Sequence, residues 1–332
     1  MEIETVLRAL GEPTRLRIMR LLARMELAVG ELAQVLGQSQ PRISRHVRIL
    51  CDAGLATRHR EGSWVFLRQA IGEDRAPPLG AMAARMLDVA ERDDPAFAAR
   101  CAEDRRHLAA IRQAREEGAQ AYFAAHAEEW DTLRTMHSPD EPVEAALAKA
   151  LSGAPLGDLL DIGTGTGRMA ELFAPDAAHV TAIDKSTEML RVARARLQDL
   201  PAGKIELLQG DFAALPFEDA SFDTVLFHQV LHYASEPRVA LAEAARVLRA
   251  GGRIAVVDFA AHEREELRTR HAHARLGFSD EQMLALLAGA GFSCNAPLAL
   301  PGEPLTVKIW TAQRGTTVAA QDAARSRETI TR

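Results

Sequence analysis

Three glycines in five residues, Gly163, Gly165 and Gly167, come directly after the apolar run Leu159–Ile162. Such a run is typical of a buried strand, and the glycines after it let the backbone turn sharply and let a ligand approach the main chain. The residues that follow, Arg168–Phe173, are expected to form a helix. The segment therefore predicts a strand–loop–helix unit with a binding site at the loop.

An acidic residue further along the chain indicates the kind of ligand. Asp184 closes the apolar segment His179–Ile183 and lies 21 residues beyond Gly163. That spacing suits a carboxylate that accepts hydrogen bonds from two ribose hydroxyls. Because the loop reads G-x-G-x-G and not the dinucleotide pattern G-x-G-x-x-G, NAD(P) is disfavoured and a ligand without a pyrophosphate is favoured.

Strand and helix patterns alternate through the rest of this region. Further strands are expected at Lys204–Gln209, Phe222–Phe227 and Arg253–Phe259, a helix at Arg238–Leu248 and a turn at Gly251-Gly252. Regular alternation predicts a parallel sheet covered by helices. After the strand that ends at Gln209, Asp211 can hold an adenine amino group while Phe212 packs on the base.

The region 118–313 resembles the class I S-adenosylmethionine-dependent methyltransferases. The resemblance lies in four segments in order: LLDIGTGTGRMAELF, VTAIDKSTEML, GDFAALPFEDASFDTVLFHQVLHYASEP and RVLRAGGRIAVVDF. It implies an α/β Rossmann-like fold with a mostly parallel seven-stranded sheet, and S-adenosyl-L-methionine or S-adenosyl-L-homocysteine as the ligand. Residues 121–134, AYFAAHAEEWDTLR, resemble the lid-forming segment of that family.

The same resemblance implies a role for each residue at the ligand. The methionine moiety would lie against Asp161, Gly163, Thr164, Gly165 and Gly167. Asp184 would bind the ribose, and Lys185 and Met189 would lie on the ribose and adenine side. Asp211 and Phe212 would contact the adenine, and His228 and Gln229 would lie near the sulfur and the carboxylate.

Other polar residues in this region are interpreted as structural. His232 and Tyr233 could form an acid/base pair, but packing at a helix start is the favoured interpretation. His271 and His273 would lie about 200° apart on a helix, so we expect a solvated pair and no metal site. Cys294 and the more distant Cys101 are expected to be packed residues.

The N-terminal region has a different character. Residues 1–75 contain 12 arginines and 9 acidic residues, a net charge of +3 in a chain of net charge −6. A basic module on an acidic chain suits a local contact with a polyanion. Helices are expected at Glu2–Leu10, at Arg15–Ala23 with Thr14 as N-cap, at Val29–Leu36 and at Pro41–Leu50.

The fourth of these helices has two contrasting faces. Ile43, Val47 and Leu50 form an apolar stripe, with Arg45 and Arg48 near the opposite side. A solvated arginine face would show the same pattern, so the next segment decides: Leu55–Arg60 and Trp64–Arg68, joined by Glu61-Gly62-Ser63, predict a basic β-hairpin. The pair predicts a major-groove reader and its wing. The candidate DNA contacts are Ser39, Gln40, Arg42, Ser44, Arg45 and Arg48 on the helix and Arg58 and Arg60 on the wing.

Residues 3–70 resemble the ArsR/SmtB family of winged-helix repressors through QSQPRISRHVRILCDAGLATRHREGSWVFL. The resemblance implies an α+β winged helix-turn-helix and a homodimer on a pseudo-palindromic double-stranded DNA operator. The first helix and the helix after the wing would form the dimer seam. Metal-sensing members carry an E-L-C-x-C type segment, but this chain has Glu26-Leu27-Ala28-Val29-Gly30, and residues 79–93 contain no histidine. No metal is therefore expected at either place.

The sequence divides into four parts: a DNA-binding domain (1–75), a helical dimerisation and connector segment (76–117), a methyltransferase-like domain (118–313) and a disordered tail (314–332). In the connector we expect a helix at Leu79–Glu91, a break at Asp93-Asp94-Pro95, and a long helical stretch Phe97–Arg134 interrupted near Gly118. No run approaches the roughly 20 apolar residues of a membrane span, and no signal peptide is recognisable, so a cytoplasmic location without membrane contact is expected. Three cysteines far apart make a disulfide framework unlikely to be the basis of the fold.

The sequence suggests three candidate functions. The full fusion resembles S-adenosylhomocysteine-responsive regulators of the methionine cycle, which implies an effector pocket that controls operator binding. An active methyltransferase with an autoregulatory DNA-binding domain is the alternative. Arsenic methylation is disfavoured, because residues 118–332 hold one cysteine and As(III) needs several thiolates. The sequence leaves open the methyl acceptor, the choice between the two ligands, the sign of the response and the operator.

Overall fold

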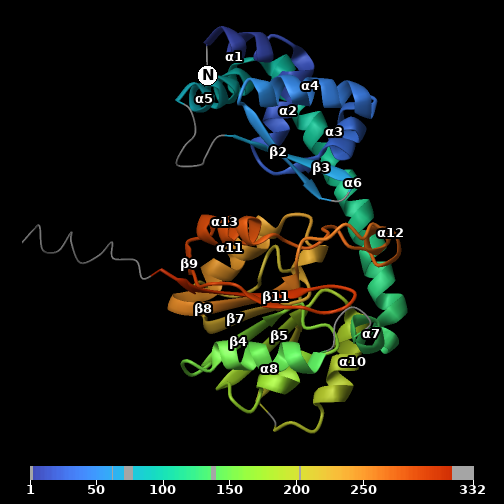
Figure 1. Ribbon diagram of the computed structural model, residues 1–332, viewed down its shortest axis with the longest axis vertical. Coiled ribbons are helices and arrows are strands. Elements are labelled where there is room, and N and C mark those ends of the chain that lie inside the picture. The colour runs from blue at the N-terminus through green and yellow to red at the C-terminus, as the bar shows by residue number, and fades with distance from the viewer. Residues whose placement is uncertain (1–2, 62, 71–77, 136–139, 202, 316–332) are drawn as a thin grey trace, which may run out of the picture. The chain divides into compact units, whose positions relative to one another are not determined.

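The computed structural model describes residues 3–61, 63–70, 78–135, 140–201 and 203–315 (Figure 1). The chain divides into two units: the first comprises the N-terminal part up to Gly118 with Glu263–Glu265, and the second comprises Ala119–His262 and the residues from Glu266 onward. No helix of the described chain is both long and apolar enough to span a membrane. The predicted tail lies almost wholly outside the described residues.

The first unit is helical with a small sheet. Its helices are α1 (Ile3–Leu10), α2 (Pro13–Leu22), α3 (Val29–Leu36), α4 (Gln40–Asp52), α5 (Pro78–Asp93) and the N-terminal part of α6 (Pro95–His126). Strands β1 (Leu27–Ala28), β3 (Trp64–Gln69) and β2 (Ala56–Glu61) pair antiparallel in that order. The fully buried side chains Ile18, Leu32 and Leu50 lie in the core that these elements share.

Two local predictions in this part of the chain are wrong. Thr14 is not the N-cap of α2: Glu12 has the extended backbone of a cap and its carboxylate accepts a hydrogen bond from Arg15 N at 3.0 Å, while Pro13 starts the helix. Thr14 is buried, and its hydroxyl accepts a hydrogen bond from Gln38. Helix α6 is not interrupted at Gly118, because one glycine costs a helix of 32 residues only about 1 kcal/mol. The interruption comes after His126, at the 3-10 turn Ala127–Glu129 before α7 (Trp130–Thr135).

The second unit is built on one sheet. The strands of the main path, in spatial order, are β10 (Leu298–Leu300), β11 (Val307–Arg314), β8 (Leu248–Phe259), β7 (Phe222–His228), β4 (Asp158–Ile162), β5 (His179–Asp184) and β6 (Ile205–Gln209). The five from β8 to β6 are parallel, and β11 is antiparallel to β8. A further short strand, β9 (Phe292–Cys294), also pairs with β11. The predicted fold, a mostly parallel sheet of seven strands, is confirmed for this path.

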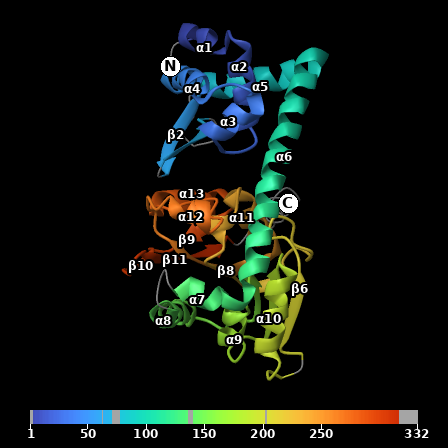
Figure 2. The same ribbon diagram turned by 90° about the vertical axis from the view of Figure 1, so that its right-hand side faces the viewer.

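Helices cover both faces of this sheet (Figure 1, Figure 2). One face carries α8 (Asp140–Leu151), α9 (Arg168–Phe173) and α10 (Thr187–Leu197), and the other carries α11 (Pro237–Val247) and α13 (Asp280–Gly289). Each face has its own apolar core: Leu159 and Phe173 belong to the first and Phe227 and Trp310 to the second. The carboxyl ends of β4, β5 and β7 therefore meet at one edge, where α/β sheets bind their ligands.

Two predictions fail in the second unit. Gly251-Gly252 is not a turn between elements, because β8 runs through it; Gly251 has φ +77°, and the pairing with β7 shifts register between Phe222 and Thr224, as at a β-bulge. His271 and His273 do not share a helix, because α12 (Glu266–Arg270) ends before them, and His273 is buried instead of solvated. Local periodicity could not show either burial or strand continuity.

Candidate functional site

The glycine loop lies between β4 and α9, at the carboxyl edge of the sheet. All three glycines have positive φ, +71° at Gly163, +56° at Gly165 and +82° at Gly167, which side chains of other residues rarely allow. A side chain at Gly163 would also collide with Val230, whose Cγ2 lies 2.3 Å from the position of a Cβ atom. The loop is thus shaped by backbone geometry that only glycine supplies.

Asp184 holds this loop in place from the end of β5. One carboxylate oxygen accepts a hydrogen bond from Gly165 N at 2.8 Å, and the other accepts one from Ser186 N at 2.8 Å. Each oxygen keeps a second lone pair, so the group can still accept from a diol. Burial raises the pKa of this carboxyl, while the backbone hydrogen bonds act in the opposite direction.

Asp161, the penultimate residue of β4, is fully buried behind the loop. Its Oδ2 accepts a hydrogen bond from Thr164 Oγ1 at 2.6 Å. Its Oδ1 has no hydrogen-bond partner among the described residues. Burial raises the pKa of Asp161 to about 7. A buried carboxylate oxygen without a donor fits the ammonium group of an amino acid, and this is the observation that best matches an S-adenosyl ligand.

The residues expected on the adenine side form an ion pair. Lys185 Nζ lies 2.8 Å from Asp211 Oδ2, and both side chains are about one-third exposed. Phe212 is half-buried against the second core of the sheet. Met189 is buried in α10, and its amide donates to Ser186 Oγ. Lys185 therefore follows β5, and Asp211 and Phe212 follow the adjacent strand β6. The Met189 side chain is buried in the core.

His228 is the last residue of β7, and Gln229 follows it, one residue before Val230 at the glycine loop. Gln229 has φ +52°, uncommon for a residue with a side chain, and its amide donates to Val257 O at 2.7 Å. His228 Nε2 is buried without a hydrogen-bond partner in the described chain. Burial, with a smaller contribution from the Arg134 guanidinium, lowers the pKa of His228 to about 3. The imidazole is therefore neutral at physiological pH.

The predicted lid segment contacts the glycine loop directly. The Trp130 indole Nε1 lies 3.6 Å from the position of a Cβ atom on Gly165. Asp131 accepts a hydrogen bond from Thr166 Oγ1 at 2.7 Å and is paired with Arg196 of α10. Arg196 in turn donates to the Thr166 carbonyl at 3.1 Å. The lid thus closes on the loop through charged groups.

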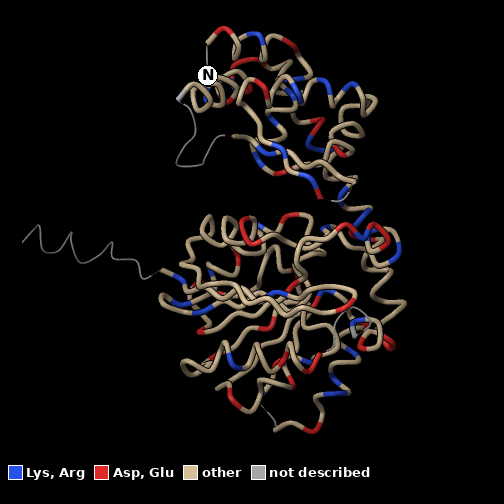
Figure 3. The backbone as a smooth tube through the Cα atoms, in the orientation of Figure 1, with Lys and Arg blue, Asp and Glu red and all other residues tan. Residues whose placement is uncertain are grey.

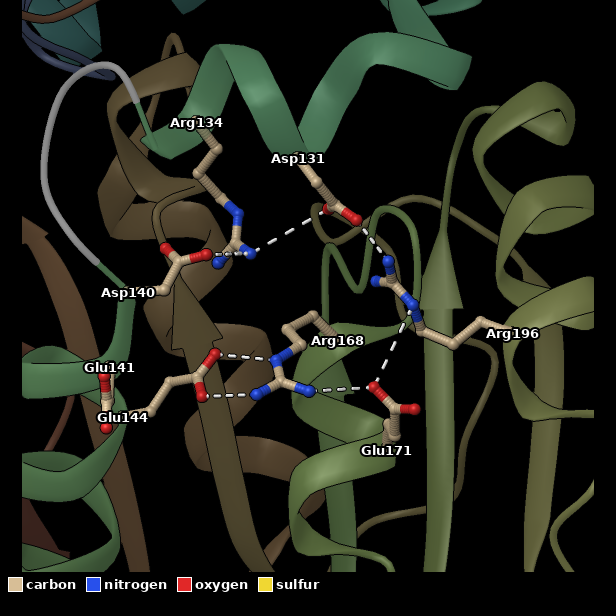
Figure 4. A pocket seen from close by; sticks show the side chains of 8 residues that line it. All are labelled: Asp131, Arg134, Asp140, Glu141, Glu144, Arg168, Glu171 and Arg196. Carbon is tan, nitrogen blue, oxygen red and sulfur yellow. Dashed lines mark hydrogen bonds and ion pairs between the residues drawn. The ribbon is translucent and has the colours of Figure 1, made fainter.

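Asp131 and Arg196 line a cavity of about 570 Å³, which we call the charged pocket (Figure 4). It is lined by Asp131, Arg134, Asp140, Glu141, Glu144, Arg168, Glu171 and Arg196. Arg168 makes two hydrogen bonds to Glu144, at 2.7 and 2.6 Å, and Arg134 pairs with Asp140 at 2.7 Å. The resemblance pointed to the lid but gave no sign of Arg196, which lies 65 residues from its partner Asp131.

A buried histidine–aspartate pair is the second group that sequence reasoning missed. His232 Nδ1 lies 2.7 Å from Asp258 Oδ1, and the two side chains are 2% and 0% exposed. His232 lies in the 3-10 turn Leu231–Tyr233, and Asp258 lies near the end of β8. The sequence favoured packing for His232 because nothing local linked it to a carboxylate 26 residues away.

The proposed DNA-reading residues lie on the exposed side of α4 and β2. Ile43, Val47 and Leu50 are buried, whereas Arg45 and Arg48 are exposed. The other candidates Ser39, Gln40, Arg42, Ser44, Arg58 and Arg60 are exposed as well. Among the described residues no carboxylate is recorded in an ion pair with Arg42, Arg45 or Arg48. Figure 3 shows basic residues along α4 and β2.

Arg115 of the long helix α6 contacts two of the DNA-reading elements. Arg115 lies 2.7 Å from Glu31, and its guanidinium lies over the Trp64 ring at 5.3 Å. The second oxygen of Glu31 accepts a hydrogen bond from Ala28 N at the start of α3. Arg115 therefore ties α6 to the first helix of the helix-turn-helix and to the wing strand β3.

Helices α1 and α5 expose apolar side chains. Ile3 and Leu7 of α1 are 62% and 57% exposed, and Met82 of α5 is 68% exposed. Met86 and Val89 of α5 are exposed as well.

Within the part of the chain that the structure describes, no group of three or more His, Cys, Asp or Glu residues is placed to hold a metal ion.

Two family models match separate parts of the chain. Residues 12–58 match the family model described as "Bacterial regulatory protein, arsR family", and residues 160–256 match the one described as "Methyltransferase domain". The chain joins an ArsR-family helix-turn-helix to a methyltransferase domain.

The similar proteins cover only parts of the chain. A 37.1 kDa protein in transposon TN4556 of Streptomyces fradiae is 35% identical over 166 residues, which are 45% of this chain and 47% of that protein. Demethylmenaquinone methyltransferase of Renibacterium salmoninarum is 34% identical over 161 residues, 48% of this chain and 63% of that protein. This chain therefore spans about half to three-fifths of these relatives.

Solved structures of methyltransferases are similar to about half of this chain. The N-methyltransferase NodS of Bradyrhizobium japonicum, in complex with S-adenosyl-L-homocysteine, has a TM-score of 0.45 and 19% identity, over 53% of this chain and 87% of that protein. So distant a likeness does not identify a methyl acceptor for this chain.

Proposed function

We propose that this chain is a DNA-binding transcriptional regulator whose methyltransferase domain binds S-adenosyl-L-homocysteine or S-adenosyl-L-methionine as an effector. In this proposal residues 1–75 bind a double-stranded operator as a homodimer, residues 76–117 connect, and residues 118–313 hold the ligand. The unpartnered, fully buried Oδ1 of Asp161 beside the glycine loop is the observation that carries the ligand assignment.

The DNA-binding part of the proposal is supported by the surface of α4. Arg42, Arg45 and Arg48 extend from a helix whose opposite side is buried, so they can enter a groove without disturbing the core. Arginines without a carboxylate partner keep their donors available for guanine edges or phosphates. Homodimer formation is supported by the exposed apolar residues of α1 and α5, which a second copy would cover.

The ligand preference follows from charge near the end of β7. His228 is neutral, and the charged group that acts on it is the Arg134 guanidinium. A sulfonium cation placed there would meet the Arg134 guanidinium, whose charge the ion pair with Asp140 offsets only in part, whereas the neutral thioether of S-adenosylhomocysteine would meet no such repulsion. We therefore propose S-adenosylhomocysteine as the preferred effector.

The coupling between ligand and DNA is assigned to α6 and the lid. The C-terminal turn of α6 carries Phe123, whose ring contacts Trp130 of the lid at 5.4 Å between centroids. The same helix carries Arg115, which contacts Glu31 and Trp64. A ligand that orders the lid would bias the position of Arg115, and a coupling free energy of about 1–3 kcal/mol is the usual size of such an effect.

Operator binding in the presence of ligand tests the proposal. A duplex selected by the wild-type protein from a random library is labelled, and its affinity is measured by anisotropy with and without saturating S-adenosylhomocysteine. We expect a change of about 5–150-fold. Asp184→Ala should abolish the change, and the exposed Asp199→Ala should not. A change that persists in Asp184→Ala would contradict the proposal.

An active methyltransferase with an autoregulatory DNA-binding domain is the second candidate. It is favoured by the buried His232–Asp258 pair and by the names of the relatives, several of which are called demethylmenaquinone methyltransferase. Sensing and catalysis are compatible in one pocket, because methyl transfer leaves S-adenosylhomocysteine as its product.

A further inference from the structure

The segment after β7 and the lid together form an aromatic cluster, defined here as Phe123, Trp130, His232, Tyr233 and His273. Phe123 contacts Tyr233 edge-to-face at 4.8 Å between ring centroids, and Trp130 lies 6.4 Å from Tyr233. His232 lies 4.1 Å from Tyr233 and 4.2 Å from His273. Rings contributed by the lid thus lie against rings contributed by the sheet edge.

The cluster adjoins the glycine loop on two sides. Val230, the residue before the 3-10 turn of His232, touches Gly163, and Trp130 lies over Gly165. A small planar molecule that replaced the contact between Phe123 and Tyr233 would therefore lie next to the proposed ligand, on the side of His228 and Gln229.

The hydrogen bonds of Asp258 fix the tautomer of His232. Asp258 accepts from His232 N at 3.0 Å, from Phe259 N at 2.7 Å and from the His232 ring at 2.7 Å. The two oxygens of Asp258 accept from two backbone amides, so Nδ1 of His232 is the ring nitrogen that donates to this carboxylate, and Nε2 is the ring nitrogen left to accept a proton. Nε2 is buried and has no hydrogen-bond partner in the described chain.

Tyr233 cannot serve as the base in this place. Burial raises the pKa of its hydroxyl well above the usual value, with smaller contributions from Tyr122 and Asp258. The phenol therefore stays protonated, and Nε2 of His232 is a proton acceptor whose ring is held in place by Asp258. A methyl acceptor with an aromatic ring and a dissociable proton would suit both the rings of the cluster and Nε2 of His232.

We propose that the aromatic cluster is a methyl-acceptor site for a phenol, with Nε2 of His232 as general base and Asp258 as its positioning residue. The inference rests on the proposed function in one respect, that an S-adenosyl ligand occupies the glycine loop. The phenol oxygen bonds to the methyl carbon of S-adenosylmethionine, the sulfur–methyl bond breaks with its electron pair left on sulfur, and the hydroxyl proton goes to Nε2. The products are the aryl methyl ether, S-adenosylhomocysteine and a proton that His232 later gives to water. The acceptor reaches Nε2 when the lid residues Phe123 and Trp130 move away from Tyr233.

His232→Asn separates a catalytic role from a structural one. The Asn amide can still donate to Asp258, as Nδ1 does, but it has no group at the position of Nε2. The full chain is assayed for transfer of a labelled methyl group from S-adenosylmethionine to phenol and to the more acidic 4-nitrophenol, with anisole, which has no hydroxyl, as the blank. His179→Asn, at the opposite end of the sheet on β5, is the matched control.

We expect His232→Asn to lower kcat with phenol by about 100-fold or more, which is the usual contribution of a general base. The loss with 4-nitrophenol should be much smaller, because an acidic phenol needs less help to lose its proton. Calorimetry at saturating S-adenosylhomocysteine supplies a second readout: Phe123→Ala should weaken the binding of phenol by about tenfold, because the variant removes one ring of the cluster.

Each outcome decides a different part of the proposal. Wild-type protein that binds S-adenosylhomocysteine but methylates neither phenol would overturn the acceptor site and leave the proposed regulator intact. An equal loss with both phenols would overturn the role of His232 as base. Failure to bind S-adenosylhomocysteine at all would overturn the proposed function, and the acceptor site with it.

Discussion

Three arginines of α4 and three arginines of the charged pocket show how differently the two regions use the same side chain. Arg42, Arg45 and Arg48 are exposed, and they form no ion pair with any residue that the structure describes. Arg134, Arg168 and Arg196 line a cavity with five carboxylates, and each is paired with at least one of them. The local supply of carboxylates decides whether an arginine is free to bind an external anion or serves to hold the fold.

The comparison teaches that arginine content alone does not identify a binding face. The charged pocket of the second unit also contains three arginines, yet their donors are occupied by Asp131, Asp140 and Glu144. In the first unit, Arg17 and Arg20 are likewise paired, with Asp104 and Glu91. The arginines of α4 differ because none of them forms an ion pair within the part of the chain that the structure describes.

The largest expected effect is on folding, from Arg168→Ala. Glu144, buried to 9% side-chain exposure, would lose both hydrogen bonds of its partner. Because Arg168 itself is partly exposed, we expect a loss of about 2–3 kcal/mol in the free energy of unfolding, below the range for a fully buried pair. Urea unfolding of the full chain measures it. An unchanged midpoint would mean that the pocket arginines are as free as those of α4.

Next in size is the effect of Arg45→Ala on DNA binding. We expect a loss of about 10–30-fold in operator affinity with unchanged stability, because the side chain makes no contact that the fold needs. Gel shift or anisotropy measures the affinity, and Arg100→Ala, an exposed arginine of α6, is the control. Unaltered operator binding by Arg45→Ala would refute the assignment of α4 as the reading helix.

A smaller effect is expected at the dimer seam. Leu7→Glu places a charge among the exposed apolar residues of α1 and α5. We expect the dissociation constant of the dimer to rise about tenfold. Sedimentation of the wild type and the variant measures this. Val239→Glu, also at an exposed apolar position but on α11, is the control. Equal dimer stability in all three proteins would place the seam elsewhere.

The smallest effect is a change in bound protons at Asp161. Its pKa is raised to about 7, so the neutral form is favoured in the folded protein, and the stability that this group contributes is lost as the pH rises through 7. A bound ammonium favours the charged form, so binding of S-adenosylhomocysteine at pH 7 should release up to about half a proton. Calorimetry in buffers of different ionisation enthalpy detects the release, and Asp161→Asn should remove it. A buffer-independent enthalpy in the wild type would argue against contact between Asp161 and the ligand.

The features that could be predicted from the sequence are those encoded over a few residues. Helix α3 has the predicted bounds Val29–Leu36, and the glycine loop lies between its predicted strand and helix. The buried stripe of Ile43, Val47 and Leu50 also follows from local periodicity. These features need no knowledge of distant residues.

The features that could not be predicted depend on contacts between distant segments. Asp131 meets Arg196, and His232 meets Asp258, only because the sheet and lid bring them together. Burial of His273 depends likewise on the ring of His232. The continuity of α6 past Gly118 is a different case, because a single glycine lowers helix stability too little to end a long helix.

Linkage between the two sites tests the central claim most directly. The affinity for S-adenosylhomocysteine is measured by calorimetry with the free protein and with the protein saturated by the selected operator duplex. The account predicts two different dissociation constants, whose ratio equals the ratio of operator affinities with and without ligand, about 5–150-fold. Identical dissociation constants for the free and the operator-bound protein would show that the arginines of α4 and the pocket at Asp161 act independently, and would contradict the account.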